Sequence, residues 1–327
     1  MYKQFFGLDR NPFDLSPDPY FVFPTKRTRE VLASVYYAVA RRKGFVVVTG
    51  EVGTGKTLMV RCLLKLWKKQ QLAFSNVFNP KLSTLDFLRF IAHDFGLKIS
   101  DPTKGNVLRA LYEFLLSQAQ KGSTTVLIVD EAHQLSMSAL EEIRLLTNLE
   151  TSQQKLVQII LVGQPELDRK LDSFELRQLK QRIAVRCQME PLGLDDTSTY
   201  IERRLELSGA KEKASAIFSR ASVDVIYRYS QGVPRSINAI CEQALVAAFA
   251  RASAIVTPEI VEDVAAYFRL HTGTGTTTMK SLVSPGIEQQ TAAKTLLQLV
   301  NAMERVLGGP VPSSPEPVLP GIKSIAQ

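Results

Sequence analysis

Short apolar runs alternate with longer amphipathic stretches between about residues 45 and 190. The apolar runs predict strands, and they read FVVVT, LAFSNVF, TVLIVD, VQIILVG and AVRCQM. The stretches between them place apolar residues at helical spacing, and they read TLMVRCLLKLWKK, LDFLRFIAHDFG, VLRALYEFLLSQAQ and ALEEIRLLTNLE. Ser138 followed by Glu141 predicts a capping box at the start of the last of these helices. Strands that alternate with helices predict an α/β fold, a parallel sheet covered on both faces.

After MEPLGLDD the strand pattern stops, and the chain to about residue 270 predicts helices alone. Gly209 and Gly232 stand where helices commonly end, and Thr257 before Pro258 predicts a helix start. We therefore predict an α/β domain over 45–190, an all-helical lid over 191–270 and an N-terminal segment, 1–44, that packs on the core. The tail, 271–327, is predicted to be flexible, with one amphipathic helix, TAAKTLLQLVNAMERVL.

Composition excludes several classes of protein. Hydrophobic residues make up 45% of the 327 residues and charged residues 22%, and no apolar run approaches the roughly 18 residues of a membrane span. The N-terminus lacks the pattern of a secretory signal, so we expect a cytoplasmic protein.

Three cysteines, far apart and without a CxxC pair, argue against disulfides and a zinc site, and we expect them to be buried as small hydrophobic residues. The three histidines are isolated as well, so no metal cluster is predicted; His133 is expected to pack or hydrogen-bond locally.

The formal net charge of +8 suits a nucleic acid or an anionic membrane surface. The basic clusters, however, are short and have no aromatic residues between them that would stack on bases. Solvated helix faces are therefore the favoured explanation, and DNA stays open as a partner.

The loop after the first predicted strand carries the clearest chemistry. Residues 50–57, GEVGTGKT, fit the pattern G-x-x-x-x-G-K-[ST] between a strand and a helix. Its glycines let backbone amides face phosphate oxygens, Lys56 neutralises β/γ charge and the Thr57 hydroxyl ligates Mg²⁺. We predict a bound nucleotide contacted by Gly50, Glu51, Val52, Gly53, Thr54, Gly55, Lys56, Thr57 and Leu58.

Two carboxylates end the strand TVLIVD. Asp130 is predicted to hold Mg²⁺ with Thr57, and Glu131 to polarise the attacking water as general base, which indicates hydrolysis. DEAH also occurs in helicases, but those need a second motor domain for which this chain has no room. A GTPase is disfavoured because no NKxD-like motif is present, and small-molecule kinases usually lack a glutamate directly after the strand aspartate.

Three further polar residues are candidates for the same site. Gln164 ends the strand VQIILVG, and it either faces the γ-phosphate or serves as a turn residue. Arg182, with Arg177 as second choice, either completes a neighbouring subunit's site or forms a surface salt bridge. Arg235 falls in the first turn of a helix, where a cation is disfavoured unless a phosphate is bound beside it.

The motifs GEVGTGKT, LIVDEAH, LVGQPEL, LRQLKQRI and GVPRSIN, in this order, resemble the AAA+ ATPases of the general secretion pathway protein A (ExeA) type over roughly residues 1–270. The resemblance implies a five-stranded parallel sheet with a helical lid, ATP with Mg²⁺, and self-assembly into a ring or filament. It makes Gln164 the sensor-1 candidate, Arg182 the arginine finger and Arg235 the sensor-2 arginine. Relatives also include ATPases of exopolysaccharide and protein-sorting loci and, more distantly, ATPases that select transposon targets.

The function that this resemblance implies is ATP hydrolysis that drives assembly or remodelling of a partner complex in secretion or exopolysaccharide export. A DNA-associated ATPase of the transposition type is the main alternative. A nucleotide-dependent switch with hardly any turnover is the third.

Overall fold

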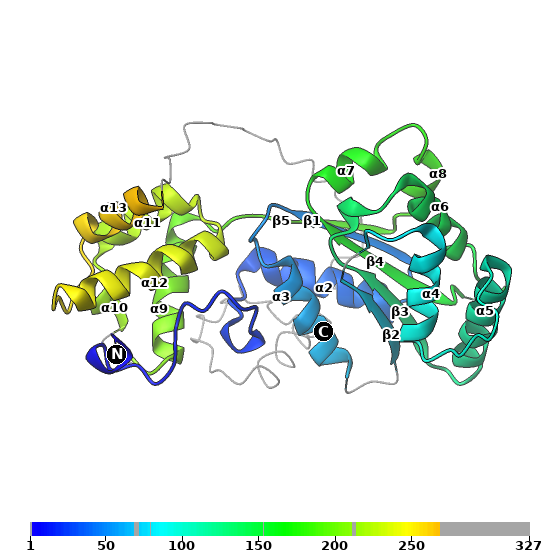
Figure 1. Ribbon diagram of the computed structural model, residues 1–327, viewed down its shortest axis with the longest axis horizontal. Helices are drawn as coiled ribbons and strands as arrows, with labels where there is room; N and C mark the ends of the chain where they lie inside the picture. Colours follow the sequence, from blue (N-terminus) through cyan, green and yellow to red (C-terminus); the bar gives the residue numbers. More distant parts are fainter. Residues whose placement is uncertain (1, 69–71, 79, 153, 211–213, 269–327) are drawn as a thin grey trace, which may run out of the picture. The chain divides into compact units, whose positions relative to one another are not determined.

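The computed structural model describes residues 2–68, 72–78, 80–152, 154–210 and 214–268 (Figure 1). These residues all fall in one compact unit, so the division into an α/β domain and a helical lid stays a prediction. The predicted tail helix lies outside the described residues. No helix of the described chain is long and apolar enough to span a membrane.

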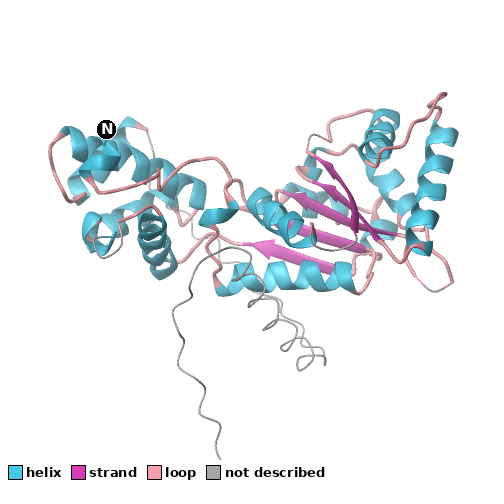
Figure 2. Cartoon of the chain, turned by 90° about the horizontal axis from the view of Figure 1, so that it is seen from below, coloured by secondary structure: helices cyan, strands magenta, loops and turns pink. Residues whose placement is uncertain are grey.

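Five parallel strands form one sheet in the order β2-β3-β4-β1-β5, as the alternating pattern predicted (Figure 2). Every residue of β1 and β4 is buried, which is why these segments are continuous apolar runs. The order puts β4 between β1 and β3, so the carboxyl ends of these three strands meet at one edge. The strands are β1 Phe45–Gly50, β2 Leu72–Val77, β3 Thr124–Val129, β4 Val157–Gly163 and β5 Val185–Met189.

Helices cover both faces of the sheet, which makes three layers (Figure 2). One cluster of buried side chains joins the β1 to β4 residues of one face, such as Val47 and Leu161, to the helices α4 to α8. Alternate strand residues face the other way, toward α2, which contacts β5, and α3, which contacts β1. The helices are α2 Lys26–Ala40, α3 Lys56–Trp67, α4 Thr84–Asp94, α5 Lys104–Gln120, α6 Met137–Leu146, α7 Glu166–Leu171 and α8 Arg177–Lys180.

The predicted capping box of α6 is wrong by two residues. Ser136 is the N-cap: its backbone is extended, and its hydroxyl accepts a hydrogen bond from the Ala139 amide. Ser138 is already inside the helix, so it has no cap function.

Beyond β5 the described chain forms helices around a second apolar cluster. Gly209 and Gly232 have φ of +112° and +70° just beyond helix ends, and Pro258 opens a helix after Thr257, as predicted. The helices are α9 Leu194–Leu207, α10 Ala214–Ile217, α11 Arg220–Ser230, α12 Pro234–Ala250 and α13 Pro258–Tyr267.

The N-terminal segment divides its contacts between the two apolar clusters. Its helix α2 packs on the sheet, but Phe6, Leu8 and Phe13 are buried in the cluster of helices α9 to α13. These residues follow the short helix α1, Tyr2–Phe5, and precede the turn η1, Pro19–Phe21. Their aromatic and aliphatic side chains complete the apolar cluster of helices α9 to α13, and the predicted packing of the segment 1–44 as a whole stays a prediction.

The cysteines behave as small apolar residues. Cys62 and Cys241 are buried and Cys187 is partly buried, and all three are free. Burial raises the pKa of Cys62 to about 11, so its thiol stays protonated at neutral pH.

Candidate functional site

The loop between β1 and α3 is shaped by glycines that nothing larger can replace. A Cβ on Gly50 would lie 2.6 Å from the Met189 carbonyl oxygen of the neighbouring strand β5. Gly55 has φ of +97°, a left-handed conformation, at the residue that precedes the first turn of α3. The loop therefore turns tightly enough to leave the first amides of α3 free for an anion.

Lys56 is held inside this loop. Its Nζ donates to the carbonyls of Gly50 at 2.7 Å and Glu51 at 2.8 Å, and the residue is 6% exposed. Burial lowers the pKa of Lys56, although the carboxylates of Glu131 and Asp130 act in the opposite direction. Among the described residues no carboxylate forms an ion pair with this ammonium group, so a phosphate is the counter-charge that fits.

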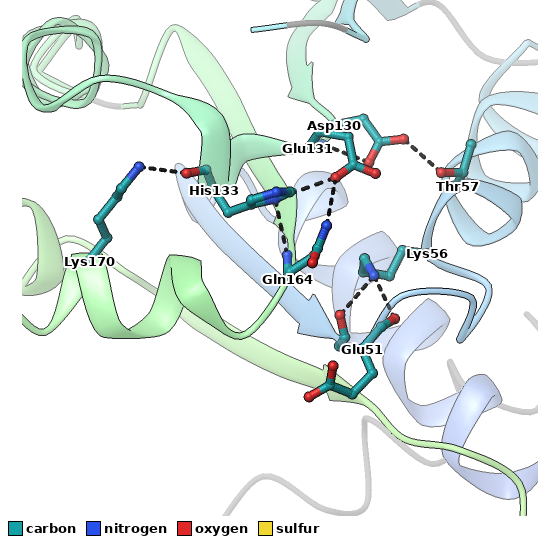
Figure 3. Close-up of polar contacts among 9 residues, drawn as sticks. Glu51, Lys56, Thr57, Asp130, Glu131, His133, Gln164 and Lys170 are labelled. Carbon is teal, nitrogen blue, oxygen red and sulfur yellow. Dashed lines mark hydrogen bonds and ion pairs between the residues drawn. The ribbon is translucent and has the colours of Figure 1, made fainter. Parts of the chain in front are cut away.

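Thr57 and Asp130 meet at the ends of α3 and β3. The Thr57 hydroxyl donates to Asp130 Oδ2 at 2.9 Å, and the Glu131 amide donates to Asp130 Oδ1 at 2.9 Å (Figure 3). Burial raises the pKa of Asp130, and the Thr57 hydrogen bond lowers it.

This pair fits a magnesium ion. Mg²⁺ prefers oxygen ligands and is usually held by one or two carboxylates together with substrate phosphates and water. The described residues contain no cluster of three or more His, Cys, Asp and Glu ligands for a metal ion. A hydroxyl and one carboxylate beside a phosphate loop match the magnesium arrangement, and Thr57 and Asp130 would hold the ion.

Glu131 lies at the same edge of the sheet, in an uncommon backbone conformation. Its φ of +53° and ψ of +34° are left-handed, which few residues other than glycine and asparagine adopt. The Gln164 side-chain amide, from the end of β4, donates to Glu131 Oε2 at 3.5 Å (Figure 3). Gln164 and Glu131 therefore come together as the strand order requires.

A cavity of about 330 Å³ opens beside these groups. Of the predicted loop contacts, Val52, Gly53, Gly55, Lys56, Thr57 and Leu58 line it, together with Glu131, Gln164 and Arg235. Gly50, Glu51 and Thr54 are not among its lining residues; the Glu51 carbonyl accepts from both Lys56 and the Thr54 hydroxyl. Asp130 does not line the cavity either, but it is hydrogen-bonded to Thr57, which does.

Sequence reasoning missed one wall of this cavity. The additional lining residues are Leu15, Ser16, Pro17, Asp18, Tyr200, Arg204, Pro234 and Asn238. Arg204 is 5% exposed, donates to the Pro12 carbonyl and to the Tyr200 hydroxyl, and lies over the ring of Phe21. Pro234 and Asn238 belong to the GVPRSIN motif. No phosphate-binding motif marks the others, because they become a wall only when the N-terminal segment folds against α9 and α12.

Arg235 brings α12 against the phosphate loop. Its amide donates to the Gly53 carbonyl at 3.3 Å, and a Cβ on Gly53 would lie 2.8 Å from Arg235 Cβ. Pro234 begins the helix, so Arg235 stands in the first turn, as predicted. Its side chain lines the cavity without an ion pair to any described carboxylate, which leaves its charge free for a phosphate.

The two other arginine candidates lie elsewhere. Neither Arg182 nor Arg177 lines the cavity in the described chain. Arg182 acts electrostatically on Glu150, and the Arg177 guanidinium lies 4.1 Å from the ring centre of Phe174, which is 76% exposed. Neither arginine reaches the cavity of its own chain, so a role in the site of a second subunit stays a prediction.

The sequence of this chain is similar to a known protein family and to a known protein. A family model described as an AAA domain matches residues 39–171. General secretion pathway protein A of Aeromonas hydrophila is 42% identical over 258 residues, which are 77% of this chain and 46% of that protein. The chain thus spans about half the length of that relative.

Solved structures share the fold at low sequence identity. The Aeropyrum pernix ORC1 protein in complex with DNA matches with a TM-score of 0.60 and 18% identity, over 79% of this chain and 69% of that one. The Aeropyrum pernix ORC2 protein, in ADPNP and ADP complexes, matches with a TM-score of 0.56 and 17% identity, over 79% and 71%. Drosophila ORC bound to DNA matches with a TM-score of 0.58 and 18% identity, over 83% and 65%.

Proposed function

The chain is an AAA+ P-loop protein of the general secretion pathway protein A type, and on this premise we propose that it hydrolyses ATP to ADP and phosphate. One observation carries the proposal: Lys56, Thr57 and Glu131 line a single cavity, with Asp130 hydrogen-bonded to Thr57. A phosphate cradle alone serves binding, but a carboxylate aimed into the same cavity serves hydrolysis.

Each residue has a defined part in the proposed reaction. Lys56 and Arg235 hold the phosphates and offset their negative charge, while the carboxylate of Glu131 accepts a proton from the attacking water. Gln164 holds Glu131 and orients that water. Thr57 and Asp130 would hold a magnesium ion, which would offset negative charge on the phosphates.

Phosphate release from ATP by the purified chain tests this proposal directly. We expect turnover that requires Mg²⁺. Nucleotide binding without turnover, at any protein concentration, would instead support the nucleotide-dependent switch.

We further propose that the active form is a homo-oligomer, a ring or filament, in which an arginine of one subunit reaches the next subunit's nucleotide. The absence of Arg182 from its own cavity is consistent with this assignment, and the relative's name supports a protein partner in a secretion system. Hydrolysis would then drive assembly or remodelling of that partner.

Arg182→Ala is expected to lower kcat at least about 100-fold and to leave ATP affinity unchanged, because an arginine finger acts on transition-state charge. Mixing this variant with Lys56→Ala subunits tests whether the arginine acts in trans. A mixed oligomer would join the intact arginine of one subunit to the intact phosphate loop of the other, so part of the activity should return, measured as phosphate release. Arg177→Ala is the comparator.

Two outcomes would not support this assignment. An Arg182→Ala variant that loses ATP binding and hydrolysis together would indicate a damaged fold. A loss of kcat without recovery on mixing would place the arginine's effect within one subunit.

The DNA-associated ATPase is the second candidate, and the net charge of +8 favours it. If duplex DNA is the partner, DNA should raise the ATPase rate, and the stimulation should fall steeply between about 50 and 200 mM salt because Lys and Arg release counterions from phosphates. A rate that DNA does not change at the lower salt concentration would exclude this candidate. A heparin control separates binding to a duplex from binding to any polyanion.

A further inference from the structure

His133 lies between the ends of strands β3 and β4, in contact with both residues that the proposed mechanism places on the attacking water. Its Nδ1 is 3.4 Å from Glu131 Oε2, and the backbone amide of Gln164 donates to the same Nδ1 at 3.4 Å (Figure 3). The side chain is 15% exposed. A single imidazole nitrogen thus faces the catalytic carboxylate and the neighbouring strand end together.

The direction of the hydrogen bond from the Gln164 amide determines which nitrogen of the neutral His133 ring carries the proton. Because Nδ1 accepts the amide proton, the neutral ring carries its own proton on Nε2. The lone pair of Nδ1 is directed at the Gln164 amide, and Glu131 Oε2 lies beside the same nitrogen, in contact with the ring at 3.4 Å. The ring therefore limits how far the carboxylate can approach it, while the Gln164 side-chain amide attracts the carboxylate from the other side at 3.5 Å.

Lys170, from α7, fixes the turn that carries the ring. Its Nζ donates to the His133 carbonyl at 2.5 Å and to the Leu135 carbonyl at 2.8 Å. The turn, η2 Ala132–Gln134, begins directly after Glu131, whose left-handed backbone is strained. A strained conformation persists only where surrounding contacts hold it, and the lysine supplies two such contacts.

Close packing brings the turn against β4. A Cβ on Gly163 would lie 3.1 Å from the His133 amide nitrogen and 3.0 Å from a Leu167 methyl carbon. The glycine leaves room for the turn, so the Gln164 amide can reach the imidazole.

We propose that His133 is a positioning residue for ATP hydrolysis: bonded to the end of β4, it fixes how close the Glu131 carboxylate comes to that strand, and so sets the carboxylate against the water that Gln164 orients. Lys170 acts one step further out and holds the backbone of the turn. This inference rests on the proposed hydrolysis, since Glu131 and Gln164 are the residues positioned. His133 takes no part in proton transfer and touches no nucleotide.

Two substitutions of His133 separate its hydrogen bond from its bulk. In His133→Asn the new side-chain oxygen stands two bonds from Cβ, as Nδ1 does, and can accept from the Gln164 amide. His133→Leu keeps most of the volume and removes the acceptor. We expect His133→Leu to lower kcat about tenfold, as for the loss of one oriented hydrogen bond, with the ATP dissociation constant unchanged.

His133→Asn is expected to keep kcat within about threefold of the native chain, since it keeps that bond. Steady-state phosphate release gives kcat, and a fluorescent ATP analogue gives the dissociation constant. A His133→Leu variant with native kcat would overturn the proposal, as would equal losses in both variants or a loss confined to ATP affinity. A native chain without turnover, by contrast, would refute the proposed function itself.

Lys170→Met gives an independent test on another element. It should lower kcat, leave ATP affinity unchanged, and add little in the His133→Leu background, because both residues act through one turn. Lys98→Met removes an exposed lysine and is the matched control, expected to match the native chain. Effects of Lys170→Met and His133→Leu that multiply fully would overturn the shared role. Thermal unfolding of each variant identifies any that fails to fold.

Discussion

A Glu131→Gln variant is expected to bind ATP and to stall. Glutamine keeps the volume of the side chain and its place beside the Gln164 amide, 3.5 Å away in the native chain, but it cannot accept a proton from water. Loss of a general base lowers kcat by about 10² to 10⁴-fold. ATP affinity should stay the same or rise, because the substitution removes a negative charge near the γ-phosphate. Phosphate release and equilibrium binding of ATP measure the two effects separately.

The matched control is Glu113→Gln, which makes the same chemical change at an exposed position of α5. It should leave both quantities at their native values. Normal turnover in Glu131→Gln would refute Glu131 as the general base. Another proton acceptor on the cavity wall would then have to take that role.

Lys56→Ala has the second largest expected effect, and it acts on binding. The native ammonium group is buried, bonded to two loop carbonyls, and paired with no described carboxylate, so its charge is available to phosphate. Its loss removes charge-assisted hydrogen bonds to the nucleotide, and ATP should bind about 100-fold more weakly, equivalent to about 3 kcal/mol. Titration with a fluorescent ATP analogue measures this change.

Lys65→Ala tests whether the effect belongs to the position or to charge alone. Lys65 lies on the same helix, α3, with its side chain exposed, and its removal lowers the net charge equally. Native affinity is expected for this control. A Lys56→Ala variant that binds ATP as tightly as Lys65→Ala would show that the loop is not the phosphate site.

The parts of the fold that were predicted correctly are those that local sequence determines. The strands at Phe45–Gly50 and Val157–Gly163 are buried on both faces, so each appears as an apolar run of the right length. The phosphate loop combines a glycine pattern with a strand before it and a helix after it. This short stretch of sequence is therefore enough to predict where Lys56 and Thr57 lie.

What sequence reasoning missed depends on contacts between distant segments. Asp18 and Arg204 line one cavity, although they lie far apart in the sequence, on either side of the five strands. Such a pairing leaves no periodic pattern in either segment. His133 was expected to bond locally, and its contacts with both Glu131 and Gln164 follow only from the side-by-side pairing of β3 and β4.

The burial of Phe6, Leu8 and Phe13 among helices α9 to α13 has a consequence for biosynthesis. These side chains leave the ribosome before the five strands do, yet their partners, as far as Val264, emerge about 250 residues later. The sheet can fold in the interval, since its strands lie between these two segments. The cavity wall at Leu15 to Asp18 therefore forms last, and a nascent chain that already has its phosphate loop still lacks one side of its nucleotide site.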